Sequence, residues 1–144
     1  MHRNLTLFII DDDEDFLTFA REKINSLGLG IKINTFPNTK EARVALQKGE
    51  VCPFWCLCDI SLYDDLYGAE ELYIFLKEHG MSHLLTYWSE HPSVHDLRLS
   101  AVTGVDVLVK EDLFKNLSEL AELVKTKIVE NLGTRQGEDE CQPE

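Results

Sequence analysis

The chain has 144 residues, of which 44% are apolar, and this is the size at which a single domain builds one hydrophobic core. Its formal net charge of -12 argues against binding to nucleic acid or to an anionic membrane surface, because both attract Lys and Arg. No apolar run is long enough to cross a bilayer, and the first residues show no signal-peptide cleavage pattern, so we expect a cytoplasmic protein.

Apolar, β-rich runs alternate along the chain with segments whose apolar residues recur at helical spacing, which is typical of a parallel sheet covered by helices. The predicted strands are residues 5–10, 31–36, 54–60, 84–89 and 105–110. Five helical segments fill the intervals, and the last of them has the clearest pattern. Their apolar stripes are Phe16, Ala20, Ile24 and Leu27; Ala42 and Ala45; Ala69, Leu72 and Leu76; Val94, Leu97 and Ala101; and Leu113, Leu117, Leu120, Val124 and Ile128.

This alternation predicts one α/β domain over residues 1–132. Its doubly wound, five-stranded parallel sheet has the order 2-1-3-4-5, the flavodoxin-like arrangement, and five helices cover it. Asn38, three residues before Glu41, is typical of the residue that begins a helix. From residue 133 onward the apolar periodicity ends, and we expect residues 133–144 to be a disordered acidic tail or the start of a linker.

Three of the four cysteines, Cys52, Cys56 and Cys58, fall within residues 51–60, which otherwise have the composition of a buried strand. Cys56 and Cys58 alternate on that strand and therefore face the same side of the sheet. The segment has no C-x-x-C pair, and thiols at alternate strand positions do not form a tetrahedral metal site by themselves. We expect buried, reduced core cysteines.

Acidic residues follow the first and third predicted strands. Asp11, Asp12 and Asp13 leave the end of the first strand, and Asp59 leaves the end of the third. These strands are neighbours in a sheet of order 2-1-3-4-5, and ligands of such sheets bind at the carboxyl ends of the strands, so the carboxylates converge there. Carboxylates a few Å apart do not all stay ionised without a cation, and their oxygens suit Mg2+. Asp13 is expected instead to belong to the acidic first turn of a helix.

Two further strand ends carry polar groups, because the fourth strand ends in Ser89 and the fifth in Lys110. An ammonium, a hydroxyl and a divalent cation around one carboxylate form a phosphoryl-transfer site, where catalysis is mostly positioning and charge neutralisation. Asp59 is the predicted nucleophile, because a carboxylate that is ionised at neutral pH needs no general base to activate it.

The polar residues of the four strand ends lie in the segments “IIDDDED”, “CLCDIS”, “TYWSE” and “VLVKE”. In this order they resemble the motifs of response-regulator receiver domains of two-component signalling, over residues 5 to about 132. The resemblance implies that Asp59 accepts a phosphoryl group from a histidine kinase or a phosphotransfer protein. It also implies that phosphorylation switches a surface for an unknown downstream protein, and we expect a signalling domain rather than an enzyme.

The same resemblance implies a role for each site residue. Ser89 hydrogen-bonds the phosphoryl group in the active state, and Lys110 pairs with its oxygens. The implied Mg2+ ligands are the carboxylates of Asp11, Asp12 and Asp59 and the backbone carbonyl of Ser61.

Several positions depart from the family pattern. Glu90 stands where a small residue is usual, and Val107 stands where an aromatic residue is usual. In the loop after the third strand, Tyr63 replaces the usual Pro and Gly68 comes one position late, so this loop is about one residue longer. These departures favour an alternative function, a phosphorylation-independent docking module that keeps the receiver fold; the complete set of site residues opposes it.

The acidic residues also suggest a third, less favoured function. Asp11 and Asp13 form a D-x-D at a strand end, which is similar to Asp-nucleophile phosphatases of the haloacid dehalogenase type. The order of the motifs opposes this alternative, because the later acidic motif should follow the Lys, whereas Asp59 precedes it. Asp64 and Asp65, in the loop after the third strand, are expected to be polar loop residues rather than metal ligands.

Overall fold

The computed structural model describes residues 5–62, 65 and 67–132 of the chain. Within them, five parallel strands form one sheet of order β2-β1-β3-β4-β5, which confirms the predicted topology. The strands are β1 (Leu5–Ile10), β2 (Ile31–Phe36), β3 (Trp55–Asp59), β4 (Leu85–Ser89) and β5 (Val107–Val109). The expectations for Tyr63, for Asp64 and for the tail at 133–144 lie outside the described residues.

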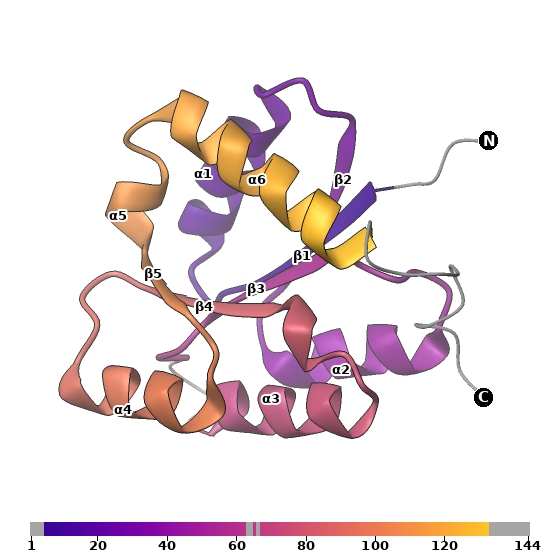
Figure 1. Cartoon of the computed structure of the whole chain (residues 1–144), viewed down its shortest axis with the longest axis vertical. Helices are drawn as coiled ribbons and strands as arrows, with labels where there is room; N and C mark the ends of the chain where they lie inside the picture. The colour runs from indigo at the N-terminus through magenta and orange to yellow at the C-terminus, as the bar shows by residue number, and fades with distance from the viewer. Residues whose placement is uncertain (1–4, 63–64, 66, 133–144) are drawn as a thin grey trace.

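Helices cover both faces of this sheet (Figure 1). Helices α1, α5 and α6 lie on one face, and α2, α3 and α4 lie on the other. The helices are α1 (Glu14–Asn25), α2 (Thr39–Lys48), α3 (Gly68–Glu78), the 3-10 turn η1 (Ser82–Leu84), α4 (Val94–Thr103), α5 (Lys110–Leu113) and α6 (Leu117–Leu132). This is the predicted doubly wound arrangement.

The strands are apolar on both sides, so alternate residues build two separate cores. Phe8, Ile10 and Tyr87 belong to the core under α2, α3 and α4. Ile9 and Trp88 belong to the core under α1 and α6. The buried strands β1, β3 and β4 carry no charged residue except at or just after their ends, and the candidate site lies there.

The cysteine prediction is confirmed for two residues and wrong for a third. Cys56 and Cys58 are fully buried, free, and part of the same core. Burial raises the pKa of the Cys56 thiol to about 12, so this thiol stays neutral. Cys52 lies before β3, is half-buried and is disulfide-bonded, so it is not a reduced core cysteine.

The fourth predicted helix forms at α4, but the face that it buries differs from the prediction. Val94 and Leu97, expected in the core, are 72% and 55% exposed. Asp96 and Leu99 are buried instead. The spacing of Val94, Leu97 and Ala101 is helical but does not indicate which side of the helix meets the sheet. The buried carboxylate of Asp96 is stabilised by hydrogen bonds from Ser89 and Ser93.

The last predicted helix is divided in two. Lys110 begins the short helix α5 directly after β5, rather than ending the strand, and α6 begins at Leu117. Asn116 starts α6, because its side chain accepts a hydrogen bond from the backbone N–H of Glu119 (3.1 Å). Leu117 is therefore 39% exposed, whereas Leu120 and Val124 keep the predicted core positions.

The described helices include none that combines the length and the apolar composition needed to span a membrane. Asn131, near the end of α6, is buried, and its side-chain amide donates a hydrogen bond to the backbone carbonyl of Phe54 (2.7 Å). This bond holds the end of α6 to the segment that enters β3, so α6 is tied to the sheet at both its apolar face and its end.

Candidate functional site

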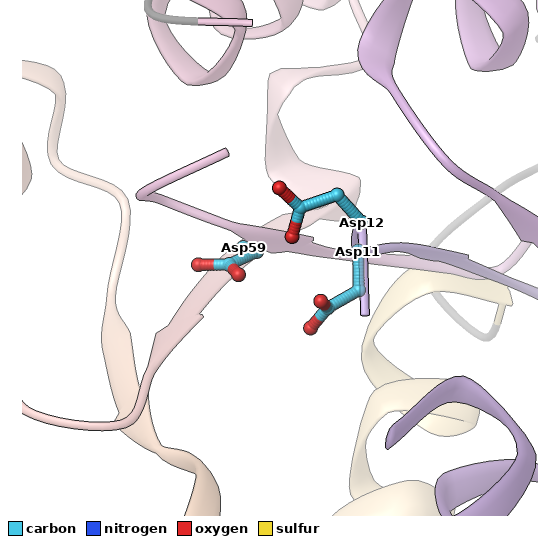
Figure 2. Close-up of side chains that lie close together, drawn as sticks. All are labelled: Asp11, Asp12 and Asp59. Atoms are coloured by element: carbon cyan, nitrogen blue, oxygen red, sulfur yellow. The ribbon is translucent and has the colours of Figure 1, made fainter. Parts of the chain in front are cut away.

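The ends of β1 and β3 bring three carboxylates together. Ile10 of β1 is paired with Cys58 of β3, so the next residues, Asp11 and Asp59, lie side by side. Asp11 is fully buried and Asp59 is 7% exposed, whereas Asp12 is exposed. Figure 2 shows the three side chains close together. One oxygen from each carboxylate lies within 4.8 Å of the others.

Backbone hydrogen bonds set the position of Asp11. Its N–H donates to the carbonyl of Phe36, at the end of β2 (3.0 Å), and its carboxylate accepts from the N–H of Asp13 (3.0 Å). Asp13 is exposed and caps α1, because its carboxylate accepts from the N–H of Phe16 (3.1 Å). The chain therefore turns from strand into helix at Asp13, which confirms the prediction that Asp13 belongs to the helix start.

Asp59 has a different hydrogen-bond partner on each oxygen. Its Oδ1 accepts from the backbone N–H of Ser61 (2.9 Å), and its Oδ2 accepts from Lys110 Nζ (3.1 Å). The N–H of Ile60 donates to the carbonyl of Trp88 on β4 (3.1 Å), which anchors the peptide after Asp59. The Ser61 peptide thus lies next to the carboxylate cluster.

Lys110 reaches this cluster from the start of α5, directly after the edge strand β5. Its Nζ lies 2.7 Å from Asp11 Oδ2 and 3.1 Å from Asp59 Oδ2, and its side chain is only 8% exposed. The same ammonium lies 4.6 Å from the centre of the Phe16 ring and 5.7 Å from that of Trp88. One buried cation is therefore shared by two carboxylates and two aromatic rings.

Burial and charge act on these groups in opposite directions. Burial raises the pKa of Asp11 to about 6, although the hydrogen bonds from Lys110 and from the Asp13 backbone oppose it. Burial also lowers the pKa of Lys110, but the hydrogen bond to Asp11 and the charge of Asp59 outweigh it and raise that pKa. Lys110 stays protonated, and its single ammonium is paired with two carboxylates, Asp11 and Asp59. A divalent cation at the cluster would bring these charges closer to balance.

The carboxylate cluster fits a hard divalent cation such as Mg2+. All three side chains offer oxygen atoms, at distances from one another that a single ion can span. Mg2+ is usually held by one or two carboxylates together with water and phosphate oxygens, which these residues permit. Asp11, Asp12 and Asp59 are the side chains that could hold it.

Ser89, at the end of β4, is 4% exposed and its hydroxyl donates to Asp96 Oδ2 of α4 (3.4 Å). Sequence reasoning did not identify Asp96. The signal was present as Ser93-x-x-Asp96 before an apolar run, a capping box, and both of its hydrogen bonds form here. Only the fold shows that the capping carboxylate also reaches Ser89.

The remaining sequence features are distributed around this site. Glu90 is exposed and, with His91, Phe16 and Phe114, lines a cleft of about 410 Å³ beside Lys110. Val107 is partly buried against the core under α2, α3 and α4. Neither residue enters the carboxylate cluster.

Asp65 lies away from the cluster, as expected for a loop residue. Its Oδ2 accepts hydrogen bonds from the backbone N–H (3.0 Å) and the hydroxyl (2.7 Å) of Thr39, in the first turn of α2. Asp65 therefore ties the segment after β3 to α2.

In sequence, no protein-family model and no curated protein matches the chain. In structure, many solved chains resemble it over most of its length. A CheY-like response regulator receiver domain protein from Methanospirillum hungatei JF-1 is 21% identical (TM-score 0.71; 92% of this chain and 100% of that chain). The phosphorylated cyanobacterial phytochrome response regulator RcpA is 18% identical (0.66; 93% and 98%), and the BeF3-activated DrrB receiver domain is 18% identical (0.64; 88% and 98%). At these identities the likeness establishes that the chain has the receiver-domain fold.

Proposed function

We propose that this chain is a phosphoacceptor receiver domain, in which Asp59 takes a phosphoryl group from a histidine kinase or a phosphotransfer protein when Mg2+ is bound. The observation that carries the proposal is the buried contact of Lys110 with both Asp11 and Asp59, inside a cluster of three carboxylates. The receiver-domain fold supports it, and two similar structures are described as phosphorylated or BeF3-activated.

Asp59 is the residue suited to receive the phosphoryl group. Asp11 is fully buried beneath Lys110, whereas Asp59 remains 7% exposed. In the proposed step a carboxylate oxygen of Asp59 forms a bond to phosphorus as the phosphorus–nitrogen bond of the phosphohistidine breaks, and the departing imidazole takes a proton from water. Asp59 needs no general base, because it attacks as a carboxylate.

The neighbouring groups supply the charge balance for this step. Bound Mg2+ would neutralise charge on the phosphoryl oxygens, and Asp11, Asp12, Asp59 and the backbone carbonyl of Ser61 would hold it. The Ser61 N–H already fixes one oxygen of Asp59, which leaves the carboxylate with a set orientation. Lys110 can exchange its contact with Asp59 for one with a phosphoryl oxygen while keeping its contact with Asp11.

The proposed output is a changed protein surface. Ser89 and Lys110 end β4 and begin α5, so their movement toward a phosphoryl group acts on the segments next to α4 and α5. Helix α4 exposes Val94, Leu97 and Val102, which are 72%, 55% and 77% exposed. We propose that an unknown downstream protein contacts this apolar side of α4. The chain would then act as a cytoplasmic signalling domain without enzyme activity, and without contacts to nucleic acid or membrane.

One alternative has support from particular residues. Glu90 adds an exposed negative charge beside Ser89, and Val107 replaces the aromatic residue that the family resemblance leads one to expect. A docking module that acts without phosphorylation would tolerate both. The phosphatase alternative has less support, because Asp13 caps α1 and lies outside the carboxylate cluster.

The first experiment measures intact mass after incubation with acetyl phosphate, with and without Mg2+. The wild type, Asp59→Ala, Asp11→Ala and the exposed-site control Asp106→Asn are compared. We expect the wild type and Asp106→Asn to gain one Mg2+-dependent phosphoryl group, and Asp59→Ala to gain none. Asp59→Asn should also remain unlabelled, since an amide is not a nucleophile of this kind.

Each other outcome selects a different function. Labelling that persists in Asp59→Ala but is lost in Asp11→Ala would indicate the phosphatase alternative. A folded wild type that gains no phosphoryl group, with acetyl phosphate or with candidate histidine kinases, would indicate the docking module.

A further inference from the structure

The hydroxyl of Ser89 is hydrogen-bonded to Asp96, a residue outside the motifs that predicted the site. Ser89 Oγ donates to Asp96 Oδ2 at 3.4 Å, and both residues are buried, at 4% and 3% exposure. The same Oδ2 accepts from the backbone N–H of Ser93 at 3.0 Å, and the N–H of Asp96 donates to Ser93 Oγ at 3.1 Å. Asp96 therefore joins Ser89 to the first turn of α4.

The two hydrogen bonds to Asp96 Oδ2 differ in strength. Hydroxyl–oxygen bonds in proteins usually measure about 2.7–2.8 Å, so the 3.4 Å bond from Ser89 is long and weak. The bond from Ser93 has an ordinary length for N–H to oxygen. Ser89 can thus leave Asp96 at low cost, while the buried carboxylate keeps a backbone partner and the favourable field of the α4 N-terminus.

We infer that Asp96 is a positioning residue that competes with the phosphoryl group for the hydroxyl of Ser89. In the unphosphorylated protein Asp96 holds this hydroxyl; a phosphoryl group on Asp59 is a stronger acceptor and takes it. The exchange removes one hydrogen bond from Asp96, in the first turn of α4, and so links the state of Asp59 to that helix. This inference rests on the proposed function, because it needs a phosphoryl group at Asp59.

The test measures the affinity of the folded protein for beryllofluoride, a phosphoryl mimic, in the presence of Mg2+. Asp96→Asn keeps an oxygen for the Ser93 N–H but offers the Ser89 hydroxyl a weaker, neutral acceptor. We expect it to bind beryllofluoride about two- to threefold more tightly than the wild type, because the bond that it weakens is at the lower end of the usual hydrogen-bond range. Asp96→Ala should show a gain at least as large.

Two control variants separate this effect from others. Ser93→Ala breaks the bond from the Asp96 N–H to Ser93 Oγ but keeps both bonds to Asp96 Oδ2, so it weakens the α4 cap and should leave the affinity unchanged. In a Ser89→Ala background there is no hydroxyl to compete for, so Asp96→Asn should have no effect there. A purely electrostatic effect of Asp96 would persist in that background.

A second readout does not depend on the mimic or on metal. Coupling constants measured by NMR give the side-chain rotamer of Ser89 in the metal-free protein. We expect one dominant rotamer in the wild type and in Ser93→Ala, and averaging between rotamers in Asp96→Asn.

The failures can be told apart. A wild type that does not bind beryllofluoride with Mg2+ would overturn the proposed function and this inference together. A wild type that binds it, with equal affinity and an equal Ser89 rotamer in Asp96→Asn, would overturn the inference alone. An affinity gain that persists in the Ser89→Ala background would also overturn it.

Discussion

Lys110 forms two buried ion pairs in the candidate site. Its ammonium forms ion pairs with both Asp11 and Asp59 and lies over the ring of Phe16. Because these groups are buried, removing the ammonium would leave two carboxylates facing each other without a countercharge, and this costs far more than losing an exposed ion pair.

We expect Lys110→Met to lower the free energy of unfolding by about 3–5 kcal/mol in metal-free buffer, the usual loss when one partner of a buried ion pair is removed. Urea denaturation with EDTA present would measure it. Lys115→Met is the matched control, because Lys115 pairs with Asp112 while both side chains are more than 60% exposed; its loss should stay below about 1 kcal/mol. Equal, small losses would show that Lys110 is not needed to balance these carboxylates.

Trp88 and Phe16 show why aromatic residues surround a charged group here. Trp88 is fully buried in β4, and its ring contacts Phe16 edge-on (5.0 Å between centroids). Both rings lie under Lys110, which gives the buried ammonium aromatic partners in addition to the carboxylates. The sequence pattern indicated only that Phe16 belongs to a helical stripe.

Among the elements, the segment after β3 has a close connection to α2. Asp65 accepts two hydrogen bonds from Thr39, whose side chain is fully buried. A Cβ placed on Gly68 would lie 2.3 Å from Asp65 Oδ2. The glycine at the start of α3 therefore leaves the space that this carboxylate occupies.

We expect Gly68→Ala to displace Asp65 from Thr39 and to lower the free energy of unfolding by about 1–2 kcal/mol. This is the usual loss when a carboxylate that accepts hydrogen bonds at the start of a helix is removed. Thermal or urea unfolding would measure the change. In an Asp65→Ala background the added methyl group meets no carboxylate, so the same Gly68→Ala change should cost nothing further. Equal losses in both backgrounds would contradict this account of the glycine.

Helices α4 and α6 show the limit of periodicity as a guide to packing. The stripe of Val94, Leu97 and Ala101 has helical spacing, and the helix forms, yet its apolar side faces solvent. Asn116 begins α6 within what the spacing indicated as one continuous helix. Spacing reports which residues share a side of a helix, whereas docking against the sheet selects the side that is buried.

For the molecule as a whole, the net charge of -12 and the local excess of carboxylates have the same consequence. Asp11, Asp12 and Asp59 lie together, with Lys110 paired to Asp11 and Asp59, and the chain as a whole has 26 acidic and 14 basic residues. A bound divalent cation relieves repulsion that is present in the folded state and largely absent from an expanded chain. Binding to the folded state alone then stabilises the fold by mass action.

We expect Mg2+ to raise the free energy of unfolding, by about 2.7 kcal/mol when its concentration is 100 times its dissociation constant. Urea unfolding over a Mg2+ series at constant ionic strength would measure it. Asp12→Asn removes an exposed member of the cluster and should reduce this gain. Asp106→Asn changes an exposed acid that precedes β5, at the opposite end of the strands from the cluster, and should keep this gain. Equal gains in all three proteins would point to general screening rather than to a site.

Much of this arrangement could be predicted from the sequence, because burial of both sheet faces leaves a strong signal. The strands β1, β3, β4 and β5 are mainly apolar runs bounded by polar residues, and their alternation with helices leaves few possible topologies. Asp11, Asp12, Asp59, Ser89 and Lys110 were predicted as site residues for the same reason: each is a polar residue at the end of a buried strand or within two residues after it.

The tertiary structure was needed where a contact joins residues that are distant along the chain or where two sides of a helix compete. Asp96 reaches Ser89 only because α4 docks with this carboxylate inward, and Asp65 reaches Thr39 across 26 positions of sequence. Such contacts depend on the relative placement of whole elements. The spacing of apolar residues shows which residues share one side of a helix or strand. Which side of α4 is buried was decided by how this helix packs against the sheet.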